Sequence, residues 1–256
     1  MAGVYIHIPF CGQLCSYCDF HFSVSKKGRE RVIGAMLREM ELRRDYLAGE
    51  RAETLYFGGG TPSLLPVDTL ELLARRAAET FGVTVPSEFT VEANPEDLTR
   101  EYLHGLRRIG ADRLSIGVQS FVERDLKMMN RRHDARRAVE AVREAQRAGF
   151  GNISVDLIYG VPGLTDAEWR SNLRRVFSLG VQHFSAYHLT VEPQTPLGVA
   201  MRKGKFRPVE EAVSEAHYAI LEEEAAGAGF EHYEVSNFAR PGFRALHNGN
   251  YWSGKR

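Results

Sequence analysis

Short apolar segments that favour β-strands alternate with helix-like segments along most of this 256-residue chain. Strict repetition of this kind predicts a parallel sheet whose strands are joined by right-handed helical crossovers. No dinucleotide-binding glycine fingerprint accompanies the repeats, so we expect a barrel-like sheet rather than a doubly wound one. The predicted strands are residues 4–9, 53–57, 88–92, 113–119, 153–159 and 183–191, and the predicted helices are residues 29–47, 67–80, 100–109, 122–129, 135–148 and 166–178.

The repetition stops after residue 191. Residues 192–208 read as a loop because they contain three prolines and two glycines. Residues 209–226 then read as a glutamate-rich helix, and residues 231–236 suit a seventh strand. We therefore divide the chain into a barrel core, residues 1–208, and a C-terminal extension, residues 209–256.

Positive and negative charges balance, since 33 Lys and Arg residues oppose 33 Asp and Glu residues. Zero net charge argues against binding to nucleic acid through a phosphate-attracting field. No apolar run approaches membrane-spanning length, and the first residues lack the positive charge of a signal peptide. We expect a soluble, cytoplasmic protein without a transmembrane segment.

All the cysteines of the chain lie within eight residues, as Cys11, Cys15 and Cys18 of a polar loop. Three thiols cannot all pair as disulfides, and they are one ligand short of a closed structural zinc site. The alternatives are a zinc site completed by His7 or His21, a group of buried thiols, and a redox pair of Cys15 with Cys18. An iron–sulfur cluster held by three cysteines would instead leave one iron open to a small molecule. The polar loop and the spacing favour the cluster.

Unusual residues stand at or near the carboxyl ends of several predicted strands, where barrels of β/α units bind their ligands. Glycines let a backbone approach a ligand, a buried carboxylate requires a cation or donors, and an arginine binds a carboxylate with two hydrogen bonds. Each residue alone fits a structural polar group equally well. Together they predict a binding site, made of Gly59, Gly60, Thr61, Glu92, Gln119, Arg131 and Asp156.

The spacing C-x3-C-x2-C after a short apolar strand resembles that of the radical S-adenosylmethionine (SAM) superfamily. Four segments, Tyr5-Ile-His-Ile-Pro-Phe-Cys11, Tyr56-Phe-Gly-Gly-Gly-Thr-Pro62, Gly117-Val-Gln-Ser-Phe121 and Asp156-Leu-Ile-Tyr-Gly160, are similar to signatures of its oxygen-independent coproporphyrinogen III oxidase family. The resemblance runs over essentially the whole chain and implies an α/β fold, the open partial (β/α)6 barrel of radical SAM type. It also implies a [4Fe–4S] cluster on Cys11, Cys15 and Cys18, with SAM chelated by the fourth iron.

The same resemblance implies which residues contact SAM. The glycine-rich stretch would meet the methionyl amino group, and the arginine would meet the carboxylate. The implied SAM-contacting positions are Tyr5, Tyr17, Gly59, Gly60, Thr61, Glu92, Gln119, Arg131, Asp156 and Thr190.

Two branches of the family differ at position 20 and near residue 247. The oxidase branch carries a fourth cysteine two residues after the third, where this chain has Phe20. It also depends on residues upstream of the equivalent of Tyr5, where this chain has only four. The heme chaperone branch combines C-x3-C-x2-C-x-F with H-N-x-x-Y-W, matched here by residues 247–252. The resemblance therefore favours a heme chaperone. The alternatives are an oxygen-independent coproporphyrinogen III oxidase and a radical enzyme acting on another substrate.

The resemblance to the heme chaperone branch implies that His247, Tyr251 and Trp252 contact heme. Imidazole ligates heme iron, and aromatic rings stack on porphyrin. The implied partners are heme and a recipient hemoprotein, such as a membrane-associated respiratory enzyme. The family normally continues into a small C-terminal domain, whereas this chain ends nine residues after His247. We therefore expect His247 to be poorly held and heme to bind weakly.

Overall fold

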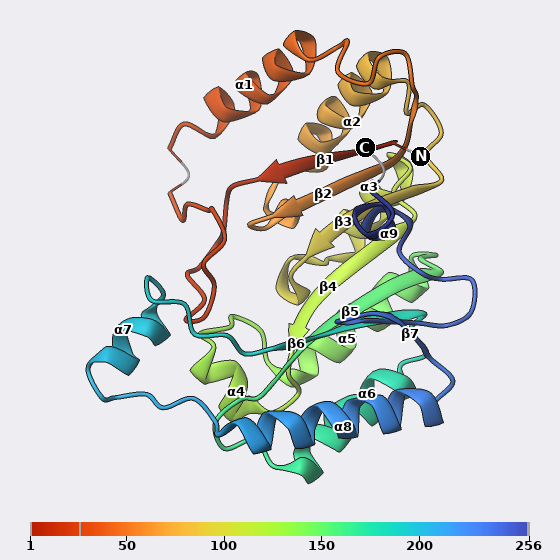
Figure 1. The fold of residues 1–256 in the computed structure, drawn as a ribbon. Coiled ribbons are helices and arrows are strands. Elements are labelled where there is room, and N and C mark those ends of the chain that lie inside the picture. Colours follow the sequence, from red (N-terminus) through yellow and green to blue (C-terminus); the bar gives the residue numbers. More distant parts are fainter. Residues whose placement is uncertain (1, 26, 255–256) are drawn as a thin grey trace.

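The computed structural model describes residues 2–25 and 27–254 (Figure 1). Its strands are β1 (Ala2–Ile8), β2 (Ala52–Gly59), β3 (Glu88–Ala93), β4 (Arg113–Gln119), β5 (Asn152–Tyr159), β6 (His183–His188), β7 (Glu231–Glu234) and β8 (Asn237–Ala239). Over the described residues they form one sheet in the order β1-β2-β3-β4-β5-β6-β8-β7. Strands β1 to β6 run parallel, whereas β8 is antiparallel to β6 and β7. The predicted α/β fold with an open partial barrel is confirmed.

Helices cross between the parallel strands on the outer face of the curved sheet (Figure 1). They are α1 (Arg29–Leu42), α2 (Val67–Phe81), α3 (Arg100–Arg108), α4 (Glu123–Met128), α5 (Ala135–Arg147) and α6 (Asp166–Ser178). Capping residues in the local sequence fix where several of these helices begin. Thr165, for example, forms a capping box with Glu168 at the start of α6. The six predicted strands and six predicted helices are confirmed, although α1 ends before residue 47 and β6 before residue 191.

A short helix lies in the segment that we expected to be a loop. α7 (Pro196–Arg202) begins after Thr195, whose side chain accepts a hydrogen bond from the Gly198 amide. Proline at the first helical position lacks only an amide that the helix would leave unpaired. The loop expectation is therefore wrong at α7, because Pro196 begins a helix here instead of preventing one.

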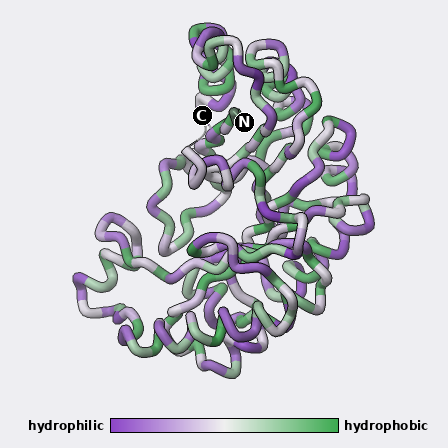
Figure 2. The backbone as a smooth tube through the Cα atoms, turned by 45° about the vertical axis from the view of Figure 1, so that its right-hand side comes forward, coloured by the Kyte–Doolittle hydropathy of each residue, from purple (hydrophilic) through white to green (hydrophobic). Residues whose placement is uncertain are grey.

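The two faces of the parallel sheet differ in polarity because successive side chains point to opposite faces. Outer-face residues such as Phe57 and Val91 are buried beneath the helices. Polar pairs adjoin on the inner face: Thr54 with Glu88, Thr90 with Arg113, Glu92 with Ser115, Ser154 with His183, and Asp156 with Ser185. Figure 2 shows hydrophilic and hydrophobic colours alternating at short intervals along the chain. A polar inner face suits a barrel that encloses a ligand.

Residues 209–254 continue the barrel. α8 (Glu211–Gly227) packs against α6, and β8 and β7 extend the sheet beyond β6. α9 (Leu246–Trp252) contacts β1 and β2, so the last described helix meets the first two strands (Figure 1). None of the helices in residues 2–25 and 27–254 combines the length and the apolar character required to cross a bilayer.

Candidate functional site

The three cysteines lie in the loop that leaves the carboxyl end of β1, at the left of Figure 1. Hydrogen bonds fasten this loop to distant parts of the chain. The Ser16 amide donates to the Met129 carbonyl at 3.1 Å, and the Leu197 amide donates to the Ser16 carbonyl at 2.9 Å. The Ser16 hydroxyl also donates to the Met128 carbonyl at 2.7 Å. Contacts with the segment after α4 and with the start of α7 therefore fix the loop.

All three thiols are free and partly buried. The Thr61 hydroxyl donates to Sγ of Cys11, and Nη1 of Arg131 donates to Sγ of Cys15, each at 3.5 Å. Burial raises the pKa of the Cys11 thiol, and the hydrogen bond from Thr61 opposes this shift. A donor aimed at sulfur favours the thiolate, which is the form that ligates iron. Across the described residues, no three His, Cys, Asp or Glu side chains converge closely enough to hold one metal ion. Three thiols are one ligand short of a closed zinc site, whereas in a cluster each cysteine binds its own iron and one iron stays open.

Arg131 connects the cysteine loop to the inner face of the barrel. Its Nη2 donates to Oδ1 of Asn94 and to the Gly117 carbonyl, both at 2.6 Å, and the predicted Tyr17 lies beside it. Its Nε is buried without a hydrogen-bond partner among the residues described. A buried donor left unpaired costs about 1–3 kcal/mol. A ligand carboxylate would remove this cost, so the arrangement fits the predicted contact with SAM.

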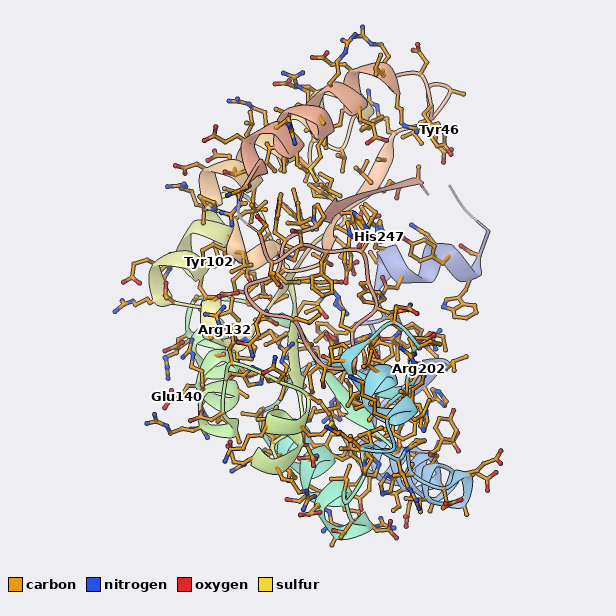
Figure 3. The ribbon with its side chains drawn as sticks, turned by 90° about the vertical axis from the view of Figure 1, so that its left-hand side faces the viewer. Tyr46, Tyr102, Arg132, Glu140, Arg202 and His247 are labelled. Atoms are coloured by element: carbon orange, nitrogen blue, oxygen red, sulfur yellow. The ribbon has the colours of Figure 1, made fainter. Side chains whose placement is uncertain are left out.

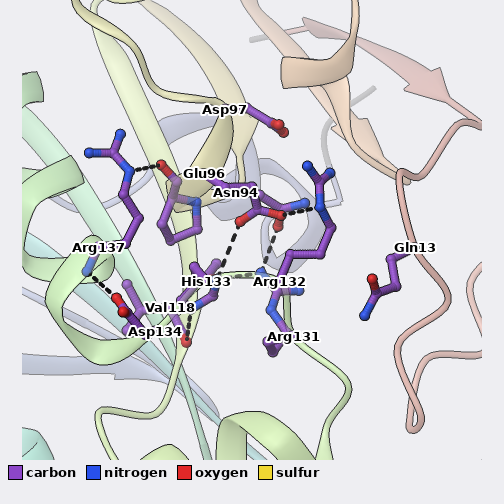
Figure 4. Close-up of polar contacts among 12 residues, drawn as sticks. Gln13, Asn94, Glu96, Asp97, Val118, Arg131, Arg132, His133, Asp134 and Arg137 are labelled. Carbon is purple, nitrogen blue, oxygen red and sulfur yellow. Dashed lines mark hydrogen bonds and ion pairs between the residues drawn. The ribbon is translucent and has the colours of Figure 1, made fainter.

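Ionic contacts hold the turn that carries Arg131, and Figure 4 shows them. His133 Nε2 lies 3.0 Å from the Val118 carbonyl, and His133 Nδ1 lies 3.3 Å from Oε2 of Glu96. Glu96 also lies 3.7 Å from Nε of Arg132. The two residues that follow Arg131 are therefore held against β4 and the segment after β3 by contacts within the protein.

Glu92 is the carboxylate near the end of β3 on the inner face. It accepts hydrogen bonds from the Tyr56 hydroxyl at 2.8 Å and from the Gly59 amide at 3.1 Å. Burial raises the pKa of Glu92 to about 7; the hydrogen bond from Tyr56 opposes this shift and the nearby Asp156 carboxylate adds to it. No cation forms an ion pair with Glu92 within the described part of the chain. A buried carboxylate without an ion-pair partner suits a cationic ligand such as the ammonium or sulfonium of SAM.

Asp156 and Gln119 lie on neighbouring strands, whereas Thr190 stands apart. The Ser115 hydroxyl lies 3.2 Å from both carboxylate oxygens of Asp156, and burial raises the pKa of Asp156 to about 6. Gln119 ends β4 with a φ of 69°, a left-handed conformation that strains a residue with a side chain. Thr190 is exposed after β6 and has no hydrogen bond to the other predicted residues in the described structure.

The glycines at the end of β2 are required by contacts within the protein itself. A Cβ atom on Gly60 would lie 2.7 Å from the Phe10 carbonyl oxygen. Gly59 has a φ of 107°, and a Cβ atom there would lie 2.6 Å from the His7 ring. The ends of β1 and β2 therefore approach more closely than other residues would permit, which brings Thr61 and the cysteine loop together.

His247 lies at the opposite end of the barrel, near the starts of β1 and β2. The residue is only 5% exposed, its Nδ1 lies 2.8 Å from Oγ1 of Thr54, and its ring centroid lies 5.0 Å from that of Tyr56. Its amide donates to Oε1 of Glu88 at 3.1 Å. Figure 3 shows His247 on the side of α9 that faces the sheet. The expectation that His247 is poorly held is therefore wrong, because buried contacts with β2 and β3 fix both its ring and its backbone.

Tyr251 and Trp252 are 67% and 66% exposed at the end of α9. The Tyr251 ring meets the His247 ring edge-on, with centroids 5.8 Å apart. The Tyr5 ring also stacks against the His247 ring, with centroids 6.3 Å apart. An exposed aromatic surface thus adjoins the buried imidazole, and such a surface suits a flat apolar ligand.

Several residues of both regions escaped the sequence analysis. The inner face of β2 and β3 contributes Thr54, Tyr56 and Glu88, and the loop after β3 contributes Asn94. The available signal was the alternation of polar and apolar residues in 53–57 and 88–92. In both segments the polar residues of this alternation are the ones that share the inner face.

Comparison with known proteins gives a consistent result. The radical SAM superfamily profile matches residues 5–176. A heme chaperone HemW of Mycobacterium tuberculosis is 38% identical over 256 residues, which cover 98% of this chain and 66% of that protein. The HemW of Bacillus subtilis is 36% identical over 259 residues, covering 100% of this chain and 68% of its own length. The chain therefore spans about two thirds of the length of these curated relatives.

Among solved structures, the chain is similar to the coproporphyrinogen III oxidase HemN of Escherichia coli, described as a radical SAM enzyme. The TM-score is 0.84 at 26% sequence identity, and the match covers 98% of this chain and 58% of the other. The shared fold thus includes α9 and the strands beneath it.

Proposed function

The chain belongs to the radical SAM superfamily and, within it, to the HemW family, and from this membership we propose that it is a heme chaperone. It binds heme beside α9 and passes it to a recipient hemoprotein. A [4Fe–4S] cluster on Cys11, Cys15 and Cys18, with SAM beside it, controls assembly or transfer.

The observation that carries the heme site is the state of the His247 ring. Its Nδ1 is engaged by Thr54, while its Nε2 has no hydrogen-bond partner among the described residues and is not one of the fully buried atoms. Burial lowers the pKa of His247, which favours the neutral imidazole that ligates metals. Tyr251 and Trp252 lie on the same helix as His247, and a porphyrin face can stack on their exposed rings.

The other end of the barrel would hold the cluster and SAM. A bound cluster of this type supplies a redox-active iron with one open coordination position. Arg131 offers its unpaired Nε to a carboxylate, and Glu92 offers a carboxylate to a cation. Asp156 is placed to accept ribose hydroxyl donors. These residues bind and orient the ligand.

The alternative function is oxygen-independent coproporphyrinogen III oxidase, an oxidative decarboxylase. Similarity to HemN supports it, since that relative shares the fold over 98% of this chain. Phe20 weighs against it, because the oxidase branch has a cysteine there. Phe20 is 68% exposed next to the cysteine loop, so its ring is available for contact with a ligand or partner and has no structural role in the core.

Heme titration followed by Soret absorbance tests the chaperone proposal. We expect saturable binding at one heme per chain, lost in His247→Ala and retained in His104→Ala, an exposed histidine of α3 that serves as the matched control. Unchanged affinity and spectrum in His247→Ala would remove His247 as the ligand.

An anaerobic assay with SAM, a reductant and coproporphyrinogen III separates the two functions. The chaperone proposal predicts no decarboxylated product from protein with a full complement of iron. Formation of protoporphyrinogen IX would establish the oxidase instead.

The partner that we propose is a hemoprotein of respiration, including a membrane-associated one, to which the chain delivers heme. Three free thiols that must remain reduced to hold a cluster favour the reducing cytoplasm as the compartment. Transfer of heme from loaded chain to an apo-hemoprotein, followed by absorbance, is the direct measurement.

A further inference from the structure

A gap in the sheet surface receives the ring of His247. Gly3 on β1 pairs in register with Thr54 on β2, and Thr54 pairs with Glu88 on β3. A Cβ atom on Gly3 would lie 2.5 Å from Oγ1 of Thr54 and 2.9 Å from Nδ1 of His247. The missing side chain of Gly3 therefore makes the room that the imidazole fills. We call Gly3, Thr54 and Glu88 the histidine socket.

Glu88 holds the backbone of the same histidine. Its carboxylate accepts the amides of Leu246 at 2.9 Å and of His247 at 3.1 Å. These are first-turn amides of α9, and α9 has no side-chain cap of its own. Glu88 is itself fixed, since Nε of the buried Arg113 lies 3.6 Å from Oε2. The start of α9 is thus tied to the inner face of β3.

Thr54 holds the ring. Its hydroxyl is fully buried and lies 2.8 Å from Nδ1 of His247. Neither group has another hydrogen-bond partner in residues 2–25 and 27–254. A neutral imidazole that ligates a metal through Nε2 must carry its proton on Nδ1, and that proton requires an acceptor when it is buried. Among the described residues, Oγ1 of Thr54 is the acceptor within hydrogen-bond distance of Nδ1.

We propose that Thr54 is a positioning residue for heme binding: its hydroxyl oxygen accepts the Nδ1 proton of His247 and so leaves Nε2 free and oriented for the heme iron. This inference rests on the proposed heme chaperone function. It adds a residue that does not touch heme and that acts through the histidine.

Thr54→Val tests the inference because valine keeps the shape and the β-branched side chain but removes the acceptor. A lost partner of a metal-ligating histidine typically weakens metal binding by about 10- to 100-fold. We expect a loss in that range in heme affinity by Soret titration, with a resonance Raman iron–histidine band at lower frequency in the ferrous protein. Thr54→Ser, which restores a hydroxyl, should return both values towards the wild type.

Thr90→Val is the matched control. Thr90 is a fully buried threonine on the inner face of β3, and its hydroxyl has no hydrogen-bond partner in the described structure. Its replacement removes the same atoms without touching the socket, so heme affinity and the Raman band should not change. Thr54→Ala removes the acceptor without adding a methyl group and provides a second measurement if Thr54→Val folds poorly.

The outcomes separate the inference from the function on which it rests. If His247→Ala binds heme as the wild type does, the proposed ligand is wrong. If His247→Ala loses heme but Thr54→Val and Thr54→Ala keep the wild-type affinity and Raman frequency, the role proposed for Thr54 is wrong. His247 then remains the heme ligand. Loss in both Thr54 variants with recovery in Thr54→Ser supports it.

Discussion

Nη1 of Arg131 lies 3.5 Å from Sγ of Cys15, although the two residues are 116 positions apart in the sequence. The same guanidinium donates to Asn94 and to the Gly117 carbonyl. One buried side chain therefore links the cysteine loop to β4 and to the loop after β3. Removing it disturbs the barrel and the iron site together.

Arg131→Lys keeps the charge but cannot reproduce the donor geometry of a guanidinium. At least one of the two acceptors is then left unpaired, and we expect a loss of about 1–3 kcal/mol in the free energy of unfolding. Iron retention should also fall. Anaerobic urea unfolding and iron analysis measure the two effects. Arg132→Lys, whose side chain is 41% exposed, is the control; equal behaviour of both variants would contradict the linking role.

Cys15→Ala should abolish cluster binding. Reconstitution of the wild type under anaerobic conditions is expected to give about four irons per chain with the absorbance of a [4Fe–4S] cluster. Iron and zinc analysis of both proteins provides the measurement. Stoichiometric zinc that survives in Cys15→Ala would show that the cysteine loop does not hold an iron–sulfur cluster.

Glu92→Gln should change how stability depends on pH. The pKa of Glu92 in the fold is about 7 and its ordinary value is 4.5. The folded state thus binds a proton that the unfolded state releases, so this stabilisation is complete below pH 4.5 and is lost as the pH rises to about 7. Relative to the wild type, Glu92→Gln should gain up to about 3 kcal/mol between these limits. Denaturation without SAM at pH 5 and pH 8 measures this gain.

The matched control for that experiment is Glu53→Gln, because Glu53 is an exposed carboxylate on the neighbouring strand β2. A difference between wild type and Glu92→Gln that stays constant with pH would count against a buried protonated carboxyl at this position.

The same substitution should have opposite effects at two glycines. Gly60→Ala places a Cβ atom 2.7 Å from the Phe10 carbonyl oxygen, and backbone cannot move aside easily. We expect a loss of about 1–3 kcal/mol. Gly34→Ala in α1 meets nothing within 4 Å and should stabilise the helix by up to about 1 kcal/mol. Thermal unfolding of both variants measures the two changes in stability. A Gly60→Ala variant as stable as the wild type would contradict the close approach of β1 and β2.

The order of strands and helices could be predicted because each segment carries its own periodicity. The cluster loop could be predicted because its three cysteines are adjacent in the sequence. The histidine socket could not, since its members come from β1, β2 and β3, meet only through the register of the sheet, and receive a residue of α9. For the same reason, distance from the end of the chain gave a wrong expectation for His247. Its order depends on Thr54 and Glu88 and not on its neighbours in sequence.

α7 was missed for a different reason. Three prolines between residues 192 and 208 suggested an irregular loop, but Pro196 occupies the first position of a helix whose start is capped by Thr195. The position of a proline relative to a capping residue carries more information than the number of prolines.

The hydrogen bonds from Ser16 to Met129 and from Leu197 to Ser16 have a consequence for biosynthesis. A chain leaving the ribosome exposes its three thiols long before it has made the residues that fasten their loop. Nascent chains whose emerged part ends at Gln119 should therefore take up little iron, whereas those whose emerged part extends to Glu210 should load. Uptake of iron would then report that translation has passed α7 and that the barrel has assembled around its first loop.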